Sequence, residues 1–299
     1  MQISDGRGDW FKDHPTGEIA FRYLLKGDPG SRDNFLWILG RQDKDFFMPR
    51  HRHNFEQIRL PLRGDMNIGN GIVLKEGQIG YFPEGLPYGP QADPLGDAAP
   101  GERVQLVLQF GGSSGYGFMS MEQRKAAWAE LQKKGKFEGP QYVRADGSRQ
   151  WGLNAVWEHV FGTKLHYPKP RYQETVLVDP RQFHWLPVEN APGVERKYFG
   201  SFTERAFWME MVRMSAGATW SSLVSEARRL AYVLKGAGRI GADLFSAEYA
   251  VQVEPGEPAS IAATEPLELF IIGLPPVRLP EVSTVELDGE EFDLAPTVG

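Results

Sequence analysis

The chain has 299 residues, of which 41% are hydrophobic and 24% are charged, and its formal net charge is −6. This composition is that of a globular protein long enough for two domains, and it excludes a disordered chain and a basic nucleic-acid-binding protein. No apolar run reaches the ~20 residues of a membrane helix. Cysteine is absent, which excludes disulfides and thiolate metal sites. The N-terminus lacks the layout of a signal peptide, so we expect a cytoplasmic protein that binds neither nucleic acid nor membrane.

The first part of the chain is predicted to consist of short β-strands. A buried strand is expected at 35–39, and a lead-in at 46–49 is followed by a second strand. Apolar side chains alternate with other residues over 57–62, so Ile58, Leu60 and Leu62 share one face, and Gln57, Arg59 and Pro61 share the other. Further strands are expected at 72–74, 79–82 and 104–110. Short strands separated by turns are typical of a barrel or sandwich.

Two blocks within this region carry candidate chemistry. In the first, His51 and His53 lie two apart, so on a strand both imidazoles point to the same side. Gln57 follows four residues later and can reach the same pocket after a short bend. The second block, residues 77–88, has glycine and proline spaced as in a strand, a tight turn and a return strand, and it ends in Tyr88.

Together the two blocks resemble the two motifs of the cupin family. Three residues of each motif match: His51, His53 and Gly64 in the first, and Gly77, Pro83 and Gly85 in the second. The first motif has Gln57 in place of its Glu and Asp45 in place of its leading Gly, and the second has Tyr88 in place of its His. The resemblance implies an all-β fold, the double-stranded β-helix or jelly-roll barrel of cupins, enclosing a small metal-binding pocket.

A different pattern follows the first barrel. Ser120 is predicted to cap a helix from about Met121 to Lys134, and Gly135 is predicted to end it. A second helix is expected at 154–161, and residues 163–200 are rich in proline and aromatic residues. We therefore expect residues 113–200 to form a helical, aromatic-rich insert that packs on a barrel.

Strand patterns return at 206–212, 231–236, 249–253 and 267–273. The stretch that ends at Gly236 resembles the end of the first cupin motif. Counting back from Gly236 as from Gly64 places Leu223, Ser225 and Arg229 at the ligand positions, and these residues do not form an ordinary metal site. The prediction is a bicupin with an N-terminal barrel at 1–112, the insert at 113–200, and a C-terminal barrel without metal ligands at 201–299.

The resemblance implies a metal site made by His51, His53, Gln57 and Tyr88. Two imidazoles with weaker oxygen donors suit a divalent or ferric transition metal such as Fe, Mn, Ni, Cu or Zn. Glu56 is expected to point away on a regular strand. The alternative is that the histidines are hydrogen-bonded in a polar barrel mouth that binds an organic ligand or nothing.

Arg59 is expected to face the same interior and to hold a carboxylate or phosphate on a ligand. The alternative is an internal salt bridge, or a bend at Pro61 that turns Arg59 outward. The first functional hypothesis is a metal-dependent oxidoreductase of dioxygenase type that acts on a small organic anion, with Tyr88 as proton donor or ligand. The second is a small-molecule binding or sensing protein without turnover. The third is a metal-independent isomerase with Tyr88 as general acid. Monomer and homodimer are both compatible with the sequence.

Overall fold

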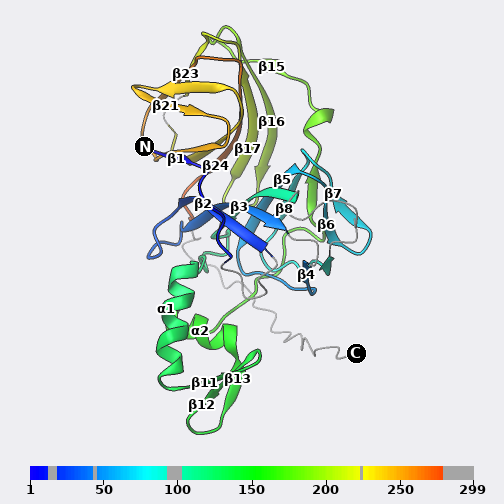
Figure 1. Ribbon diagram of the computed structural model, residues 1–299, viewed down its shortest axis with the longest axis vertical. Coiled ribbons are helices and arrows are strands. Elements are labelled where there is room, and N and C mark those ends of the chain that lie inside the picture. Colours follow the sequence, from blue (N-terminus) through cyan, green and yellow to red (C-terminus); the bar gives the residue numbers. More distant parts are fainter. Residues whose placement is uncertain (13–18, 43–45, 93–102, 223–224, 279–299) are drawn as a thin grey trace.

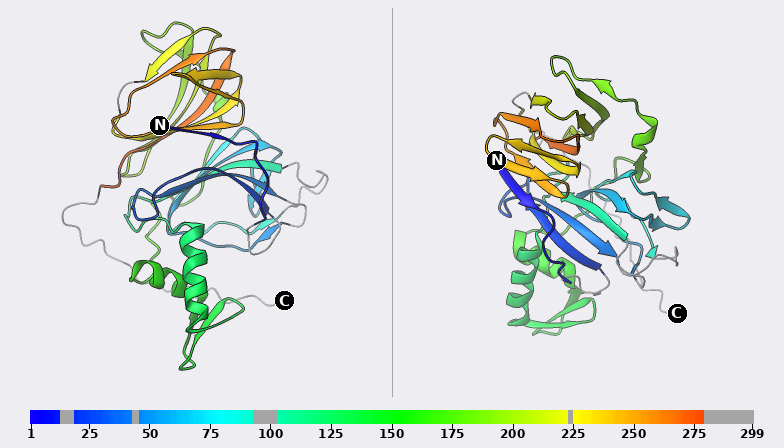
Figure 2. Two further views of the ribbon diagram at one scale, coloured as in Figure 1. Left: turned by 60° about the vertical axis from the view of Figure 1, so that its left-hand side comes forward. Right: turned by 45° about the horizontal axis from the view of Figure 1, so that its top comes forward.

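The computed structural model describes residues 1–12, 19–42, 46–92, 103–222 and 225–278. Most of these residues form two β-barrels that pack against each other (Figure 1). A small subdomain with two helices extends from the first barrel on the side away from the second (Figure 2). The predicted all-β fold with a helical insert is therefore confirmed.

The first barrel contains a six-stranded antiparallel sheet in the order β14-β8-β5-β10-β3-β2. Two short pairs, β4-β9 and β6-β7, lie opposite this sheet and close the barrel. The strands are β2 (Ile19–Lys26), β3 (Phe35–Gln42), β4 (Phe47–Met48), β5 (Glu56–Arg63), β6 (Met66–Gly69), β7 (Ile72–Leu74), β8 (Ile79–Phe82), β9 (Gln91–Ala92), β10 (Arg103–Phe110) and β14 (Val176–Val178).

The second barrel contains a seven-stranded sheet, β1-β22-β19-β24-β17-β16-β15, and a four-stranded sheet, β18-β23-β20-β21. Its strands are β1 (Gln2–Asp5), β15 (Leu186–Pro187), β16 (Val194–Phe202), β17 (Phe207–Met214), β18 (Thr219–Ser222), β19 (Arg228–Lys235), β20 (Ala237–Ile240), β21 (Asp243–Ser246), β22 (Tyr249–Val253), β23 (Ala259–Ala263) and β24 (Leu267–Leu274). A 3₁₀ turn, η1 (Pro180–Gln182), precedes β15.

The two barrels are repeats of one unit, as the sequence predicted. Gly64 and Gly236 end the matching strands β5 and β19 with left-handed φ angles of 72° and 78°. Gly85 and Gly256 also match, because their backbone N–H groups donate to the carbonyl oxygens of His53 and Ser225, and their φ angles are 78° and 77°, a conformation that favours glycine. Glu248 takes the place of Gly77 with a φ of 71°. The pairing of Leu60 with Leu106 on β10 corresponds to the pairing of Tyr232 with Phe270 on β24.

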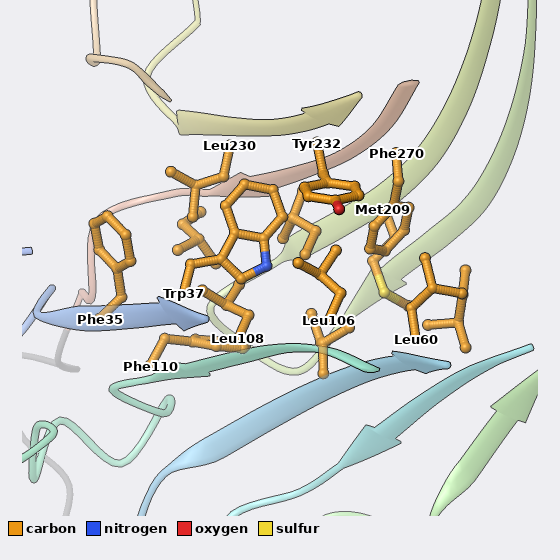
Figure 3. Close-up of a cluster of buried hydrophobic side chains, with 14 of the residues drawn as sticks. Phe35, Trp37, Leu60, Leu106, Leu108, Phe110, Met209, Leu230, Tyr232 and Phe270 are labelled. Carbon is orange, nitrogen blue, oxygen red and sulfur yellow. The ribbon is translucent and has the colours of Figure 1, made fainter. Parts of the chain in front are cut away.

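The main hydrophobic core lies between the barrels rather than inside either of them (Figure 3). Leu60 and Leu106 of the first barrel meet Tyr232 and Phe270 of the second in one buried cluster. Trp37 is fully buried, and its ring centroid lies 6.3 Å from that of Tyr232. The alternation predicted for 57–62 is confirmed, but its apolar face packs on the second barrel. The other face, with Gln57 and Arg59, lines the interior of the first.

The insert contains both predicted helices, α1 (Met121–Gln132) and α2 (Gly152–Phe161). Ser120 caps α1 through a reciprocal capping box with Gln123, which satisfies two backbone donors of the first turn. α1 ends two residues before the predicted Lys134, and α2 ends at Gly162 with a left-handed φ of 68°. A three-stranded sheet joins the helices and consists of β11 (Gly135–Glu138), β12 (Gln141–Arg144) and β13 (Arg149–Trp151).

The predicted segment limits 1–112, 113–200 and 201–299 need correction, because the barrels exchange strands. β1 belongs to the second barrel and pairs with β22, since the edge of that sheet needs partners for its backbone N–H and C=O groups (Figure 1). From the predicted insert, β14 joins the first barrel, and β15 and β16 join the second. Asp45 and Leu223 lie outside the described residues.

Candidate functional site

Four predicted site residues meet at one end of the first barrel. His51 and Tyr88 lie on adjacent segments, joined by two backbone hydrogen bonds of 3.0 Å and 2.9 Å. The ring centroid of His51 lies 4.5 Å from that of Tyr88 and 4.9 Å from that of His53. Gln57 approaches from β5, with its Oε1 accepting from the Tyr88 hydroxyl at 3.3 Å. The structure thus brings the residues together, and their roles remain a prediction.

Arg59 lies at the centre of this group. Its Nε donates to Oε1 of Gln57 at 2.6 Å, and its Nη2 donates to the hydroxyl of Tyr88 at 3.0 Å. The guanidinium carbon lies 4.6 Å from the centroid of the Phe82 ring, close enough for a cation–π contact. Arg59 is only 9% exposed, and no carboxylate of the described residues forms an ion pair with it. The inward orientation that the sequence left open is therefore the one observed.

The two imidazoles are half-buried and form the part of the site nearest to solvent. Nδ1 of His51 lies 2.7 Å from the carbonyl oxygen of Pro49. Because a carbonyl only accepts, Nδ1 carries a proton and the lone pair of neutral His51 is on Nε2. Burial, followed by the charges of His51 and Arg59, lowers the pKa of His53 well below its ordinary value. His53 is therefore neutral at physiological pH.

A resident metal ion does not fit the donors as they are arranged. The two imidazoles are suitable ligands, but the oxygens of Gln57 and Tyr88 already accept from or contact the Arg59 cation. Burial raises the pKa of Tyr88, which keeps it a phenol rather than a phenolate ligand. Among the residues that the structure describes, no group of three or more His, Cys, Asp or Glu side chains is placed to hold a metal. Glu56 faces away from the pocket, as predicted.

Other residues complete the interior. Gln105 on β10 also faces inward and is buried with its Oε1 lacking a hydrogen bond within the described chain. Phe55 stacks on His53 with a centroid separation of 4.4 Å, and Phe82 lies 4.7 Å from Tyr88. Sequence reasoning missed both phenylalanines because nothing distinguishes them from core residues. The site therefore combines one cation and several amides with aromatic walls.

A carboxyl pair that the sequence did not indicate lies on the opposite face of β5. Glu56 is fully buried, and desolvation followed by the nearby charge of Glu84 raises its pKa to about 8. Glu84 is 1% exposed and accepts from Ser114 and from Nη1 of Arg171, the latter at 2.7 Å. Arg171 belongs to the proline-rich segment, so this contact fastens that segment to the first barrel.

The second barrel has no comparable polar site at the matching positions that the structure describes. The hydroxyl of Ser225 accepts from the backbone N of Ala227 at 3.0 Å, and Arg229 donates to the carbonyl of Glu257 at 2.6 Å. Beyond them on β19, Ala231 and Val233 pack in an apolar cluster that fills the barrel.

The sequence matches no protein-family model and no curated protein. Similar folds are found among solved structures. Quercetin 2,3-dioxygenase from Acinetobacter baumannii has 12% identity and a TM-score of 0.53, covering 94% of this chain and 88% of its own. Oxalate decarboxylase from Bacillus subtilis has 14% identity and a TM-score of 0.55, with coverages of 91% and 75%.

The vicilin of hazelnut, Corylus avellana, is similar to a comparable degree, with 12% identity, a TM-score of 0.54, and coverages of 91% and 86%. These similarities show the duplicated cupin fold for the part of the chain that the structure describes. One of these proteins is a dioxygenase, one is a decarboxylase and one is a vicilin, so the shared fold does not determine the function of this chain. No helix in the described parts of the chain is both long and apolar enough to span a membrane.

Proposed function

We propose that this chain, which has the bicupin fold, binds a small organic anion inside its first barrel through Arg59. The observation that supports this most directly is a buried guanidinium with two neutral hydrogen-bond partners and no carboxylate partner among the described residues. A buried charge is costly unless it is paired, so an anionic ligand is the partner that the site lacks. Gln57 and Tyr88 orient the guanidinium and leave its remaining N–H groups for a carboxylate or phosphate.

The neutral state of His53 is compatible with this proposal. A neutral imidazole neither repels Arg59 nor competes with it for the anion, and it can donate or accept one hydrogen bond at the rim. Phe55 and Phe82 offer an apolar surface for the carbon part of the ligand. The preferred ligand is therefore a small carboxylate or phosphate ester with a compact apolar portion.

The experiment is a calorimetric screen of small carboxylates, each paired with its neutral amide. Wild type should bind an acid more tightly than its amide, and Arg59→Met should lose about ten- to hundredfold in affinity for the acid. Arg59→Lys should recover part of the loss, because a point charge cannot make two parallel bonds. The matched control is Arg229→Met, which removes an arginine inside the second barrel and should leave the affinity unchanged. Equal affinity of wild type and Arg59→Met for the acid would refute the proposal.

A metal-dependent oxidoreductase of dioxygenase type is the second candidate. The observation that favours it is the pair of imidazoles, with ring centroids 4.9 Å apart at the mouth of one barrel. It requires that Gln57 and Tyr88 release Arg59 before they serve as ligands. Elemental analysis of wild type and of His51→Ala/His53→Ala decides the matter. A stoichiometric metal that the double substitution abolishes supports this candidate, and equal metal content in both proteins removes it.

A further inference from the structure

A large cleft lies between the two barrels, apart from the site around Arg59. Its volume is about 940 Å³, at the upper end of the range of small-molecule pockets. The apolar floor comes from both sheets and includes Leu60 and Leu62 on one side, and Met211 and Tyr232 on the other. The cleft thus has room and apolar surface for an organic molecule.

The lining is strongly basic, although the chain as a whole has a net charge of −6. Eight cationic side chains face three acidic ones, Glu76, Glu248 and Glu268; the cations are Arg7, Arg22, Arg41, Arg63, Arg181, Lys197, Arg213 and Lys235. Some of them are neutralised locally, as in the pairs Arg7–Asp5 and Arg213–Glu195 at 2.7 Å and 2.6 Å. Arg41, Arg63 and Lys235 make no ion pair within the described residues. The cleft therefore carries positive charge that its own walls do not balance.

Two of these arginines flank one apolar residue on the first barrel. Val104 of β10 pairs with Arg41 on β3 and with Arg63 on β5, so the three residues form one row across adjacent strands. Residues in such a row point to the same face of the sheet, and the outer two are about 10 Å apart at a strand spacing of about 4.8 Å. Nε of Arg41 is buried and lacks a hydrogen bond among the residues described. The row thus places two cations on either side of Val104 at one wall of the cleft.

The corresponding row of the second barrel contains an acidic residue that the row of the first barrel lacks. There Glu268 of β24 pairs with Arg213 on β17 and with Lys235 on β19. An acid thus lies between the two cations in the second barrel, whereas Val104 occupies that position in the first. The repeated row therefore contains an acid in the second barrel and none in the first.

Two tryptophans hold cations on the two walls. Arg22 and Arg41 lie over the Trp10 ring at 4.3 Å and 4.8 Å from its centroid. On the second barrel, Lys197 and Arg213 each lie 4.7 Å from the centroid of Trp185. Cation–π contacts restrain these side chains, so part of the ordering that binding an anion requires is already present.

We propose that this cleft binds an amphipathic organic anion, with its acidic head group between Arg41 and Arg63 and its apolar part on the floor between the barrels. The head group is a carboxylate, sulfonate or phosphate, because these match the planar fork of arginine. The apolar part is an aryl or alkyl group, because Leu60, Leu62 and Met211 form the surface beneath it. This site is independent of the anion site at Arg59.

The test uses the fluorescent aryl sulfonate 8-anilinonaphthalene-1-sulfonate and its neutral relative N-phenyl-1-naphthylamine. Removing the clamp with Arg41→Gln/Arg63→Gln should weaken the sulfonate at least tenfold and change the neutral probe less than twofold. Val104→Glu, which places an acid between the two arginines as Glu268 lies between Arg213 and Lys235 in the second barrel, should have the same effect. Thermal melts establish that each variant is folded, and the two routes to the same loss do not depend on one substitution.

Two controls distinguish binding in this cleft from a general effect of charge and from binding at Arg59. Lys164→Gln/Lys169→Gln removes the same charge from exposed positions outside the cleft and should change sulfonate affinity less than twofold. Arg41→Gln/Arg63→Gln should bind the small carboxylate of the first-barrel site as tightly as wild type does, so failure of this proposal is distinguishable from failure of that site. The inference is overturned if the lysine control weakens the sulfonate as much as the clamp variant does, or if the neutral probe binds wild type as tightly as the sulfonate.

Discussion

The two barrels share a backbone plan but differ in what they enclose. At matching positions of β5 and β19, the first barrel has Arg59 and Pro61 where the second has Ala231 and Val233. On the neighbouring strand, Gln105 corresponds by register to Leu269. The interior of the second barrel is a continuous apolar cluster, while that of the first combines a small apolar cluster with a polar network around a cation. The interior of the second barrel is thus filled by apolar side chains, whereas that of the first contains polar side chains that can bind a ligand.

This difference has an energetic side. An apolar interior stabilises a barrel by about 25 cal/mol for each Å² of apolar surface removed from water. A buried, unpaired guanidinium works against stability. The contact with the second barrel, where Leu60 and Leu106 pack against Tyr232 and Phe270, provides apolar burial that offsets the cost of Arg59. The inter-barrel core therefore allows the first interior to remain polar.

The largest effect is expected when an arginine is placed in the second barrel at the position that matches Arg59. Ala231→Arg should lower the free energy of unfolding by about 5 kcal/mol, since it combines overpacking with a buried unpaired charge. Urea denaturation of the purified variant measures the effect. Arg59→Met, which removes the arginine from the first barrel, should change the free energy of unfolding by less than about 1 kcal/mol or increase it. A second barrel that accepts the arginine without loss would show that its interior is not a closed core.

The two barrels also differ on the faces of β5 and β19 that point away from the barrel interiors, and this difference should make stability depend on pH. Glu56 of β5 corresponds to Arg228 of β19, but Glu56 is fully buried without an ion pair among described residues, whereas Arg228 pairs with Glu254 at 3.1 Å. The folded-state pKa of Glu56 is raised from 4.5 to about 8, mainly by burial. Its stabilising contribution is therefore complete below about pH 4.5 and is lost as the pH rises towards 8.

Wild type should lose on the order of 3 kcal/mol of stability from this group between pH 5 and pH 8.5. Glu56→Gln should flatten that dependence, as measured by urea denaturation across the pH range. Glu210→Gln is the matched control in the second barrel. The pKa of Glu210 is raised to about 7. Glu210→Gln should therefore remove only the loss of stability that occurs below about pH 7, and the loss between pH 7 and pH 8 should remain. Identical pH profiles for wild type and Glu56→Gln would contradict the assignment.

The smallest effect is expected at the barrel mouth. His51→Ala/His53→Ala should change the free energy of unfolding by less than about 1 kcal/mol, because both rings are half-buried and neither belongs to an apolar cluster. Thermal melting measures the change. Unfolding of the double variant would mean that the histidines support the first barrel rather than its site.

Much of the fold could be predicted from short-range signals. Ser120 caps α1 as predicted, and the stretch that ends at Gly236 identified the repeat of the strand that ends at Gly64. The assignment of β1 to the second barrel could not be predicted, because Gln2–Asp5 is short and polar and is stabilised by pairing with Tyr249–Val253, far along the chain.

The site was only partly predictable for a similar reason. The motif positions indicated that His51, His53, Gln57 and Tyr88 would converge, and the strand alternation placed Arg59 on their side. The sequence could not show that the guanidinium bonds to two of those residues, because this depends on side-chain directions across two segments. Nor could it show that Ile58 and Leu60 face another barrel rather than their own interior.

The central claim is that the first barrel binds an anion on Arg59 without a resident metal. The most direct test is calorimetric titration of the best carboxylate from the screen, before and after exhaustive treatment of the protein with a chelator. The two affinities should agree within twofold, and Arg59→Met should abolish binding in both preparations. Loss of binding after chelation, with recovery on adding a transition metal such as Fe²⁺ or Mn²⁺, would contradict the account and make the imidazole pair the anchor.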